Sequence, residues 1–267
     1  MPKIIVVLPV YNEEKHLPGL LPRLSPQADI LVLVNDGSTD GSFKLLQAFV
    51  RKRKGAYLLD LPENRGMAGA LEAGFLFSLY LKRMGQAGPE DLVVTIDADG
   101  QHKPEYIPKI AGYLAKRKAD VVLTRRDFSV YPRYKVLGNR FLTWTNSFLS
   151  GTHYKDVESG LRMLKVRTLE PVLRYYTGVK YSCAQEIALL TARSGFYIDN
   201  DFRVEIAYYR PGTTFWDGFI VLGMSLFTFL RWVLRAARPV SDDIELNQAA
   251  FLRSRQLWGR NKRSGKR

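Results

Sequence analysis

Strand and helix patterns alternate regularly through the first 124 residues, and this alternation limits the fold more than any other feature of the sequence. Short β-branched and aliphatic runs, such as Ile4 to Leu8, are typical of strands buried on both faces. Strands are expected at 4–8, 30–34, 57–61, 92–96 and 120–124, with helices at 13–24, about 40–53, 67–82 and 104–116. Repeated strand–helix–strand units predict an α/β fold with a mostly parallel sheet.

The second half is less regular and is expected to contain helices at 137–149 and 184–194 and strands at 160–166 and 204–209. The chain of 267 residues, 46% apolar and 25% charged, is long enough for one large domain or one domain with an appendage. Its one cysteine, Cys183, excludes an internal disulfide and a cysteine-built metal site. The N-terminus shows no secretory pattern, so a reducing, cytoplasmic setting is expected.

Four polar segments follow the expected strands where a parallel sheet binds its ligands. In such sheets the ligand lies at the carboxyl ends of the strands, near a switch in strand order. The segments are rich in small, polar or acidic residues and comprise 9–13, 35–40, 64–69 and 97–102. Their convergence at one edge predicts an active site there.

Asp97-Ala98-Asp99 directly follows a buried strand, so both carboxylates can reach one hard cation. Gln101 and His102 continue the polar cluster and add further ligands. The alternative is a solvated turn with a helix cap, because two nearby aspartates occur in many loops.

Asn35 to Asp40 also ends a buried strand, and its acidic groups suit a ribose hydroxyl or a base edge. A turn with a helix cap accounts for part of this pattern. Asn64 to Ala70 fits either a phosphate-binding helix start or a helix that packs closely on the sheet. It lacks the lysine and hydroxyl residue of a P-loop.

Taken together, these motifs resemble family 2 glycosyltransferases of the GT-A fold, and among them most the polyprenol-phosphate sugar synthases. The resemblance covers about residues 3–212 and implies a GT-A, Rossmann-like sheet flanked by helices. The motifs, in order, are Pro9-Val10-Tyr11-Asn12-Glu13, Asn35-Asp36-Gly37-Ser38-Thr39-Asp40, Asn64-Arg65-Gly66, Asp97-Ala98-Asp99-Gly100-Gln101 and Asp156-Val157-Glu158-Ser159-Gly160-Leu161-Arg162.

The resemblance also implies roles for individual residues. A Mg²⁺ or Mn²⁺ ion would be held by Asp99 and Gln101, with Asp97 orienting the site and adding to the metal ligands. The donor would contact Pro9, Tyr11, Asn12, Glu13, Asp36, Asn64, Gly66, Asp97, Ala98, Arg126, Arg140 and Ser159. Donor or acceptor phosphate would be contacted by Arg126, Arg140, Ser159 and Arg162. Catalysis would involve Asp97, Asp99, Asp156, Arg162 and Glu186. Inversion at the anomeric carbon follows from the family alone.

The acceptor decides whether a general base is needed. A hydroxyl acceptor must lose a proton, whereas a phosphate monoester is already an anion. Asp156 and Glu186 are the candidate bases, but Ile187 stands where hydroxyl-using relatives often carry a second acid, which favours a phosphate acceptor. Met67 departs from the usual small or basic residue and leaves the sugar open. Alternatives are a transferase acting on a lipid or glycan hydroxyl, and a non-catalytic nucleotide-sugar or nucleic-acid binding protein.

The C-terminal part combines an apolar run with basic residues. Residues 215–234 are mostly apolar, with one Asp and one Arg as their charged residues, and Trp216 and Trp232 flank the run. Arg231, Arg235 and Arg238 recur at helical spacing and form one basic edge. This pattern predicts an interfacial membrane helix, with a helix packed on the domain or a dimer interface as the alternative.

The formal charge is +14, of which +7 lies between Arg231 and the C-terminus. We therefore expect a catalytic domain at 1–212, an interfacial helix region at 213–240 and a basic tail at 241–267. The expected partners are a nucleotide sugar, a lipid phosphate and the anionic cytoplasmic face of a membrane, with no nucleic acid. A homo-oligomer stays open.

Overall fold

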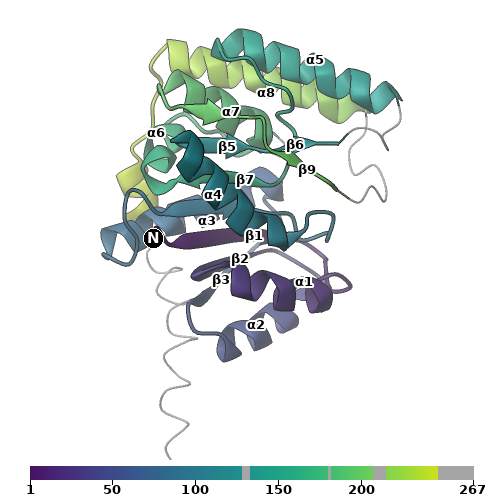
Figure 1. Ribbon diagram of the computed structural model, residues 1–267, viewed down its shortest axis with the longest axis vertical. Coiled ribbons are helices and arrows are strands. Elements are labelled where there is room, and N and C mark those ends of the chain that lie inside the picture. The colour runs from purple at the N-terminus through teal and green to yellow at the C-terminus, as the bar shows by residue number, and fades with distance from the viewer. Residues whose placement is uncertain (128–132, 180–181, 207–214, 246–267) are drawn as a thin grey trace, which may run out of the picture.

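A seven-stranded sheet forms the centre of the protein in a computed structural model, which describes residues 1–127, 133–179, 182–206 and 215–245 (Figure 1). Its strands, in spatial order, are β3 (Ala56–Leu61), β2 (Ile30–Asp36), β1 (Ile4–Val10), β4 (Leu92–Thr95), β7 (Arg162–Lys165), β5 (Val121–Leu123) and β8 (Ile198–Asp199). All neighbours are parallel except β7, which runs antiparallel to β4 and β5. The expected mostly parallel α/β fold is confirmed.

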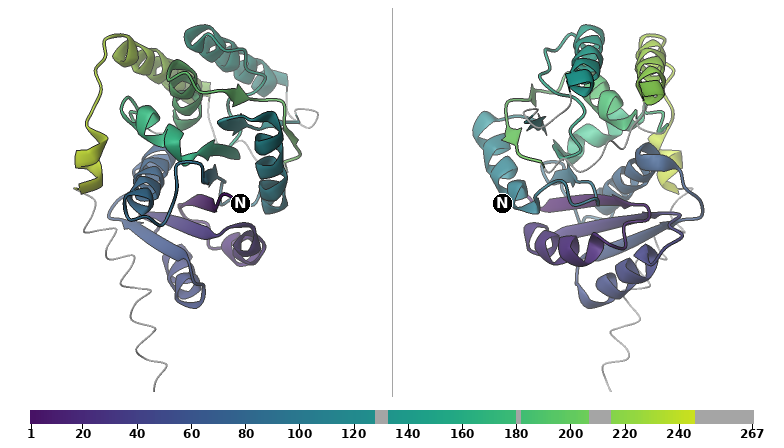
Figure 2. Two further views of the ribbon diagram at one scale, coloured as in Figure 1. Left: turned by 60° about the vertical axis from the view of Figure 1, so that its left-hand side comes forward. Right: turned by 90° about the vertical axis from the view of Figure 1, so that its right-hand side faces the viewer.

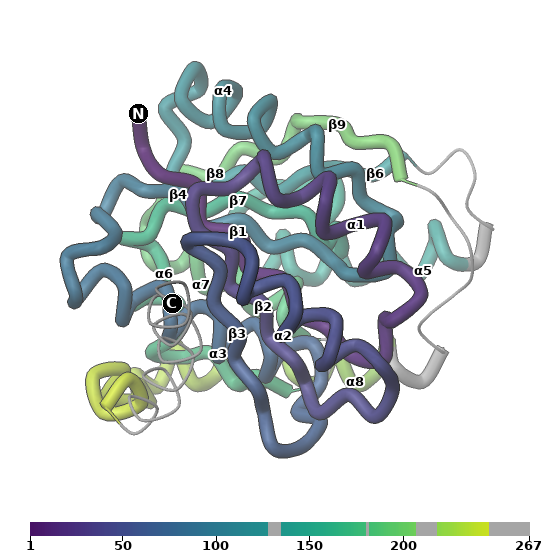
Figure 3. The backbone as a smooth tube through the Cα atoms, turned by 90° about the horizontal axis from the view of Figure 1, so that it is seen from below, coloured from purple at the N-terminus to yellow at the C-terminus, as the bar shows by residue number. Residues whose placement is uncertain are grey.

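Helices cover both faces of the sheet, and Figure 3 shows α4 and α3 on opposite sides of the strands. One face packs on α1 (Leu17–Leu24), α2 (Ser42–Lys52) and α4 (Ile107–Arg117), and the other on α3 (Gly66–Arg83), α6 (Leu169–Leu173) and α7 (Cys183–Arg193). Short 3₁₀ turns lie at η1 (Ser25–Gln27), η2 (Pro104–Tyr106) and η3 (Val166–Thr168).

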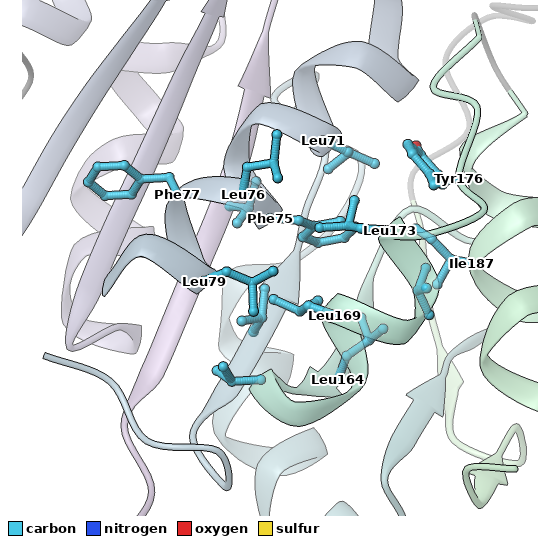
Figure 4. Close-up of a cluster of buried hydrophobic side chains, with 14 of the residues drawn as sticks. Leu71, Phe75, Leu76, Phe77, Leu79, Leu164, Leu169, Leu173, Tyr176 and Ile187 are labelled. Carbon is cyan, nitrogen blue, oxygen red and sulfur yellow. The ribbon is translucent and has the colours of Figure 1, made fainter. Parts of the chain in front are cut away.

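The central strands are apolar throughout because successive side chains enter different cores. In β1, Ile5 and Val7 join the cluster under α3, while Val6 and Leu8 join the cluster under α1 and α4. Figure 4 shows part of the first cluster, where Phe75 of α3 lies beside Leu173 of α6. A side chain at Gly74 would collide with Val7, so this glycine lets α3 approach the sheet closely.

The second half differs from the sequence expectation in several elements. The expected strand 160–166 is β7, and its antiparallel direction was not predicted. No sequence prediction covered β6 (Arg125–Arg126), β8 or α6. The strand expected at 204–209 is present only at its start, where Val204 belongs to β9 (Arg203–Val204), which pairs with β6 in a second sheet. Expected strand residues 207–209 lie outside the described part. These elements are two to five residues long, too short for a periodic pattern.

Two long helices, α5 (Arg133–Ser150) and α8 (Phe215–Val233), lie side by side beyond α7 (Figures 1 and 2). After α8 the chain returns to the central sheet domain, where Val240 and Ile244 join the cluster under α3. Residues up to 245 therefore pack on the domain, beyond the boundary expected at 240. The boundary expected at 212 and tail residues 246–267 lie outside the described part.

Candidate active site

The candidate site lies where the carboxyl ends of β1, β2 and β4 meet the start of β7. The chain adds β2 and β3 on one side of β1 and then β4 on the other, which creates a switch in strand order at this edge. Because β7 is antiparallel to β4, its first residue, Arg162, pairs with Thr95 at the end of β4. The motif that precedes β7 is thereby brought against the motif that follows β4.

The contact between these two motifs is close. Thr95 Oγ1 donates a hydrogen bond to the Gly160 carbonyl at 2.8 Å. A Cβ at residue 160 would lie 2.5 Å from Asp97 Cγ and would overlap the carboxylate oxygens. Only glycine leaves room for Asp97 in this position. The sequence showed the two motifs separately but not their apposition.

Asp99 and its neighbours form a compact polar cluster after β4. Asp99 Oδ1 accepts a bond from the Gln101 backbone N–H at 2.9 Å, and Oδ2 accepts one from Gln101 Nε2 at 2.7 Å. His102 Nε2 lies 3.7 Å from Asp97 Oδ2, and the buried His102 Nδ1 has no partner among the described residues. The predicted ligands are therefore neighbours.

The electrostatics of this cluster favour a positive ligand. Burial raises the pKa of Asp97, and burial together with the charge of Asp97 raises the pKa of Asp99. Burial lowers the pKa of His102 to about 4, so its ring is neutral at pH 7. A cation would relieve the repulsion between the two carboxylates.

The donor set fits a magnesium-type ion that is completed by substrate. The described residues contain no group of three or more His, Cys, Asp and Glu arranged to hold a metal. Two carboxylates and an amide oxygen suit Mg²⁺, which is usually held by one or two carboxylates together with water and substrate phosphate. An ion held by these residues would therefore need water or substrate phosphate to complete its ligands.

Both carboxylate oxygens of Asp156 accept hydrogen bonds from neighbouring side chains. Arg126 Nε donates to Asp156 Oδ2 at 2.8 Å, Arg126 Nη2 donates to Oδ1 at 2.9 Å, and Asn139 of α5 adds a bond at 3.3 Å. Burial alone would raise the pKa of Asp156, but the charge and hydrogen bonds of Arg126 outweigh it, so the pKa lies below its ordinary value. A carboxylate held in this way is a weak proton acceptor.

Glu186 lies on α7 and is also buried. Its oxygens accept bonds from the Thr177 backbone N–H at 2.6 Å, the Thr177 hydroxyl at 2.5 Å and the Ser182 hydroxyl. Burial raises the pKa of Glu186 despite these bonds. The structure therefore uses Glu186 to close the turn before α7.

The remaining residues around β7 take different places. Ser159 Oγ lies 2.7 Å from Thr124 Oγ1 in the interior. Arg162 is buried, and its Nε has no partner among the described residues. Arg140 is exposed on α5, next to Asn139. Of the predicted phosphate contacts, only Arg162 combines burial with an unused donor.

The loops after β1 and β2 hold one another. Asn12, with φ of 55°, accepts a bond from the Thr39 backbone N–H at 2.8 Å, and its own N–H donates to Ser38 Oγ at 3.1 Å. Glu13 Oε2 contacts His16 Nδ1 at 2.5 Å. Pro9 is buried in β1, whereas Tyr11 is exposed. We call the loops after β1 and β2 the donor wall, because their residues are the ones expected to contact the donor.

Asp36 connects that wall to the loop before α3. Its Oδ1 accepts a bond from the Arg65 backbone N–H at 2.8 Å, and burial raises its pKa. Gly37, with φ of 67°, lies so close to Asn64 that a Cβ would be 2.7 Å from the Asn64 nitrogen. Asn64 Oδ1 in turn accepts the Gly66 N–H at 2.8 Å. Residues 36, 64 and 66 therefore meet as predicted.

Sequence reasoning assigned no role to several residues at this edge. Glu158 accepts a bond from Gln185 Nε2 at 2.5 Å, and burial raises its pKa. Asn139 bonds both Arg126 and Asp156. Glu158 could have been found from its place inside a quoted motif, whereas nothing near Asn139 in the sequence signals its role.

Comparison with known families identifies the chain. The family model described as glycosyl transferase family 2 matches residues 5–169, which span every strand from β1 to β7. The chain belongs to glycosyl transferase family 2. The GT-A expectation is confirmed, and this family 2 glycosyltransferase is an enzyme rather than a non-catalytic binding protein.

Two curated relatives of this family 2 glycosyltransferase have names that describe transfer to a lipid phosphate. It is 29% identical over 248 residues to undecaprenyl-phosphate mannosyltransferase of Micrococcus luteus, covering 88% of this chain and 95% of that one. It is 26% identical over 209 residues to UDP-N-acetylglucosamine–dolichyl-phosphate N-acetylglucosaminyltransferase of Methanococcus voltae, covering 72% and 80%.

The fold is shared with a solved structure, glucosyl-3-phosphoglycerate synthase of Mycobacterium tuberculosis. The TM-score is 0.62 at 20% identity, over 86% of this chain and 80% of that one. At this identity the likeness establishes the fold of the family 2 glycosyltransferase and nothing finer.

Proposed function

We propose that this glycosyltransferase moves a hexose from a nucleotide-diphosphate sugar, of the GDP-mannose or UDP-glucose type, to a polyprenyl phosphate at the cytoplasmic face of a membrane. The main support is that both candidate bases, Asp156 and Glu186, are buried and bound by other groups. An acceptor that is already an anion needs no base, only positioning. The named lipid-phosphate relatives point the same way.

The reaction would proceed by inversion. An oxygen of the acceptor phosphate would form a bond to the anomeric carbon while the bond to the nucleoside diphosphate breaks. Arg162, with its unused buried donor, would bind phosphate oxygens, and the wall formed by Asn12 and Asp36 would hold the nucleoside.

Asp97, Asp99 and Gln101 would hold Mg²⁺ or Mn²⁺ against the donor diphosphate. Such an ion neutralises the charge that builds on the leaving diphosphate. Gly160 keeps Asp97 in place from the opposite side of the site. The synthase that shares the fold has been crystallised with Mn²⁺ and UDP-glucose, at a TM-score of 0.61 and 19% identity.

Turnover is expected to require a metal, one nucleotide sugar and a polyprenyl phosphate together. The measurement is release of nucleoside diphosphate from a panel of UDP- and GDP-sugars, with Mg²⁺ or Mn²⁺, with and without a short polyprenyl phosphate. Omitting the lipid or adding a chelator should reduce release to background. Donor binding without lipid-dependent turnover would favour a hydroxyl acceptor, and no binding of any donor would contradict the proposal.

The acceptor's location is supported by an apolar surface on α5 and α8. We call it the α5–α8 face; the exposed residues that form it are Leu137, Phe141, Trp144 and Phe148 of α5 and Phe219, Leu226, Phe227, Leu230 and Val233 of α8. The aromatic rings of α5 form a ladder, with Phe141–Trp144 and Trp144–Phe148 centroids 6.3 and 6.1 Å apart. Trp144 and Phe148 are 64% and 75% exposed.

Several polar residues of both helices face the protein interior instead. Thr143 and Asn146 of α5 and Ser225 and Thr228 of α8 are buried, and Asn146 Nδ2 donates to the Gln185 carbonyl at 2.8 Å. An ordinary surface helix shows the reverse arrangement. Large apolar side chains exposed together on neighbouring helices are typical of an interaction surface, and exposed basic residues such as Arg140 and Arg235 suit anionic lipid.

Of the basic edge predicted from Arg231, Arg235 and Arg238, two side chains bind protein groups instead of facing solvent. Arg231 donates to the Tyr175 and Ala236 carbonyls, and Arg238 turns inward to Glu72. Trp232 packs under Arg193, whose guanidinium carbon is 5.0 Å from the ring centroid. Of the described helices, none is long and apolar enough to cross a membrane. The apolar face, rather than the expected arginine edge, would make the main contact.

Charged substitutions on either helix are expected to weaken membrane binding. Trp144→Glu and Leu230→Glu should each reduce co-sedimentation with phosphatidylglycerol liposomes about tenfold or more, because each removes a large apolar group from the interface. Tyr197→Glu, at a similarly exposed residue after α7, is the matched control and should bind as the parent does. Equal binding by all three variants would contradict membrane docking through this face.

A further inference from the structure

Glu72 is a buried carboxylate on α3 that binds two arginines from distant parts of the chain. It is 5% exposed. Its Oε2 accepts a bond from Arg65 Nη2 at 3.1 Å, and its Oε1 pairs with Arg238 Nη2. The two arginines lie 173 positions apart in the sequence, so Glu72 connects the loop before α3 with the segment after α8.

On one side, Glu72 fixes the loop that carries the donor motif. Arg65 precedes α3, and its side chain runs along the start of this helix to reach Glu72, seven residues further on. Gly69 makes this path possible, since a Cβ there would lie 2.6 Å from Arg65 Cβ. The backbone N–H of Arg65 holds Asp36 in the donor wall. The position of Arg65 therefore bears directly on Asp36.

On the other side, Arg238 anchors residues 235–245, which we call the C-terminal strap. Arg238 Nε donates to the Leu173 carbonyl and its backbone N–H donates to the Arg174 carbonyl, both at 2.9 Å. Val240 and Ile244 of the strap are buried in the core under α3. The strap is thus held at several points and presents Arg238 to Glu72.

We propose that Glu72 is a positioning residue through which the C-terminal strap holds the donor loop in its binding conformation. A buried carboxylate needs compensating charge, and Arg65, which is half-exposed, supplies it weakly. Arg238 is less exposed than Arg65, so its positive charge compensates the Glu72 carboxylate more strongly and holds it where Arg65 can reach it. The expected effect on donor binding rests on the proposed function, whereas the expected ordering of the loop before α3 does not.

The first test measures hydrogen exchange in the peptide that covers residues 62–70. Glu72→Gln and Arg238→Met should each speed exchange of the Arg65 and Gly66 amides, because the loop loses its anchor. If both act through one chain of contacts, the double variant should exchange no faster than the faster single variant. Unchanged exchange in folded single variants would overturn the proposal.

A second ion pair between α3 and the strap gives the matched control. Arg83 Nη2 lies 3.1 Å from Glu245 Oε1, and both side chains are more than half exposed. Arg83→Met and Glu245→Gln should leave exchange at residues 62–70 unchanged. Equal acceleration in these controls would mean that any loosening of the strap reaches the loop, which would remove the specific role of Glu72.

Nucleotide binding separates the inference from the proposed function. UDP and GDP are titrated with Mn²⁺ and no membrane, and Glu72→Gln should weaken the binding nucleotide about tenfold, while Glu72→Asp recovers part of the loss. Faster loop exchange with parent-like nucleotide affinity would overturn the link to the donor site. If the parent binds neither nucleotide, the proposed function fails, while the exchange data still decide whether the strap orders the loop.

Discussion

Asp99→Asn is expected to reduce glycosyl transfer about 100- to 1000-fold, the loss that typically follows removal of one group stabilising transition-state charge. The substitution keeps the size of the side chain and an oxygen that can accept the Gln101 backbone N–H. It removes one of only two carboxylates in the proposed metal set, so the affinity for Mn²⁺ should fall as well. The measurement is the initial rate of nucleoside diphosphate release at several Mn²⁺ concentrations.

Asp201→Asn is the matched control for that variant. Asp201 is an exposed carboxylate that contacts Lys155 and Arg117 on the surface. Its loss should leave the rate and the Mn²⁺ dependence unchanged, because exposed ion pairs contribute little to stability. Parent-like transfer by Asp99→Asn would show that the metal assignment is wrong, whereas recovery at high Mn²⁺ would support weakened metal binding.

The sheet could be predicted from the sequence because its strands are buried on both faces. Runs such as Ile30 to Val34 are apolar at every position, which is typical of strands buried on both faces. Helices α1, α2 and α4 bury one side only, so their apolar residues recur at helical spacing. The direction of β7 was not available in the same way. The sequence of a four-residue strand does not indicate whether it pairs parallel or antiparallel with its neighbour. The antiparallel pairing of β7 with β4 is decided by tertiary packing.

The sequence indicates which candidate site residues lie close together only where they follow the same strand. Asp97, Asp99 and Gln101 lie together because they follow one strand, and strand ends place their side chains directly. The sequence could not show that the carboxylates of Asp156 and Glu186 are already hydrogen-bonded, since their partners Arg126, Thr177 and Ser182 reach them only in the folded chain. The same limit hid the role of Glu72, because its partner Arg238 lies 166 residues away in the sequence.

Helix α5 shows a further limit of periodicity. A pattern of Leu137, Phe141, Trp144 and Phe148 is normally taken as the buried side of a helix, yet these side chains are exposed. The rule assumes that water is the only solvent. A helix that borders lipid can place its apolar side outward and its Asn146 inward, so the same spacing fits two opposite orientations.

Gly160→Ala is expected to reduce transfer about 100-fold while the protein stays folded. An added Cβ would overlap the Asp97 carboxylate and displace it, and a shift of about 1 Å at a reacting site can cost that much in rate. The obstacle is the end of one side chain rather than backbone, so Asp97 can move aside at little cost in stability. Transfer rate and thermal unfolding are therefore measured on the same preparations.

Gly112→Ala provides the comparison that separates catalysis from folding. Gly112 lies in the middle of α4, and a Cβ there meets nothing within 4 Å. Alanine should stabilise this helix by about 0.5–1 kcal/mol and leave transfer unchanged. A Gly160→Ala protein that unfolds early would point to the Thr95 contact instead of Asp97. Full activity in Gly160→Ala would contradict the expectation that transfer requires Asp97 in its present position.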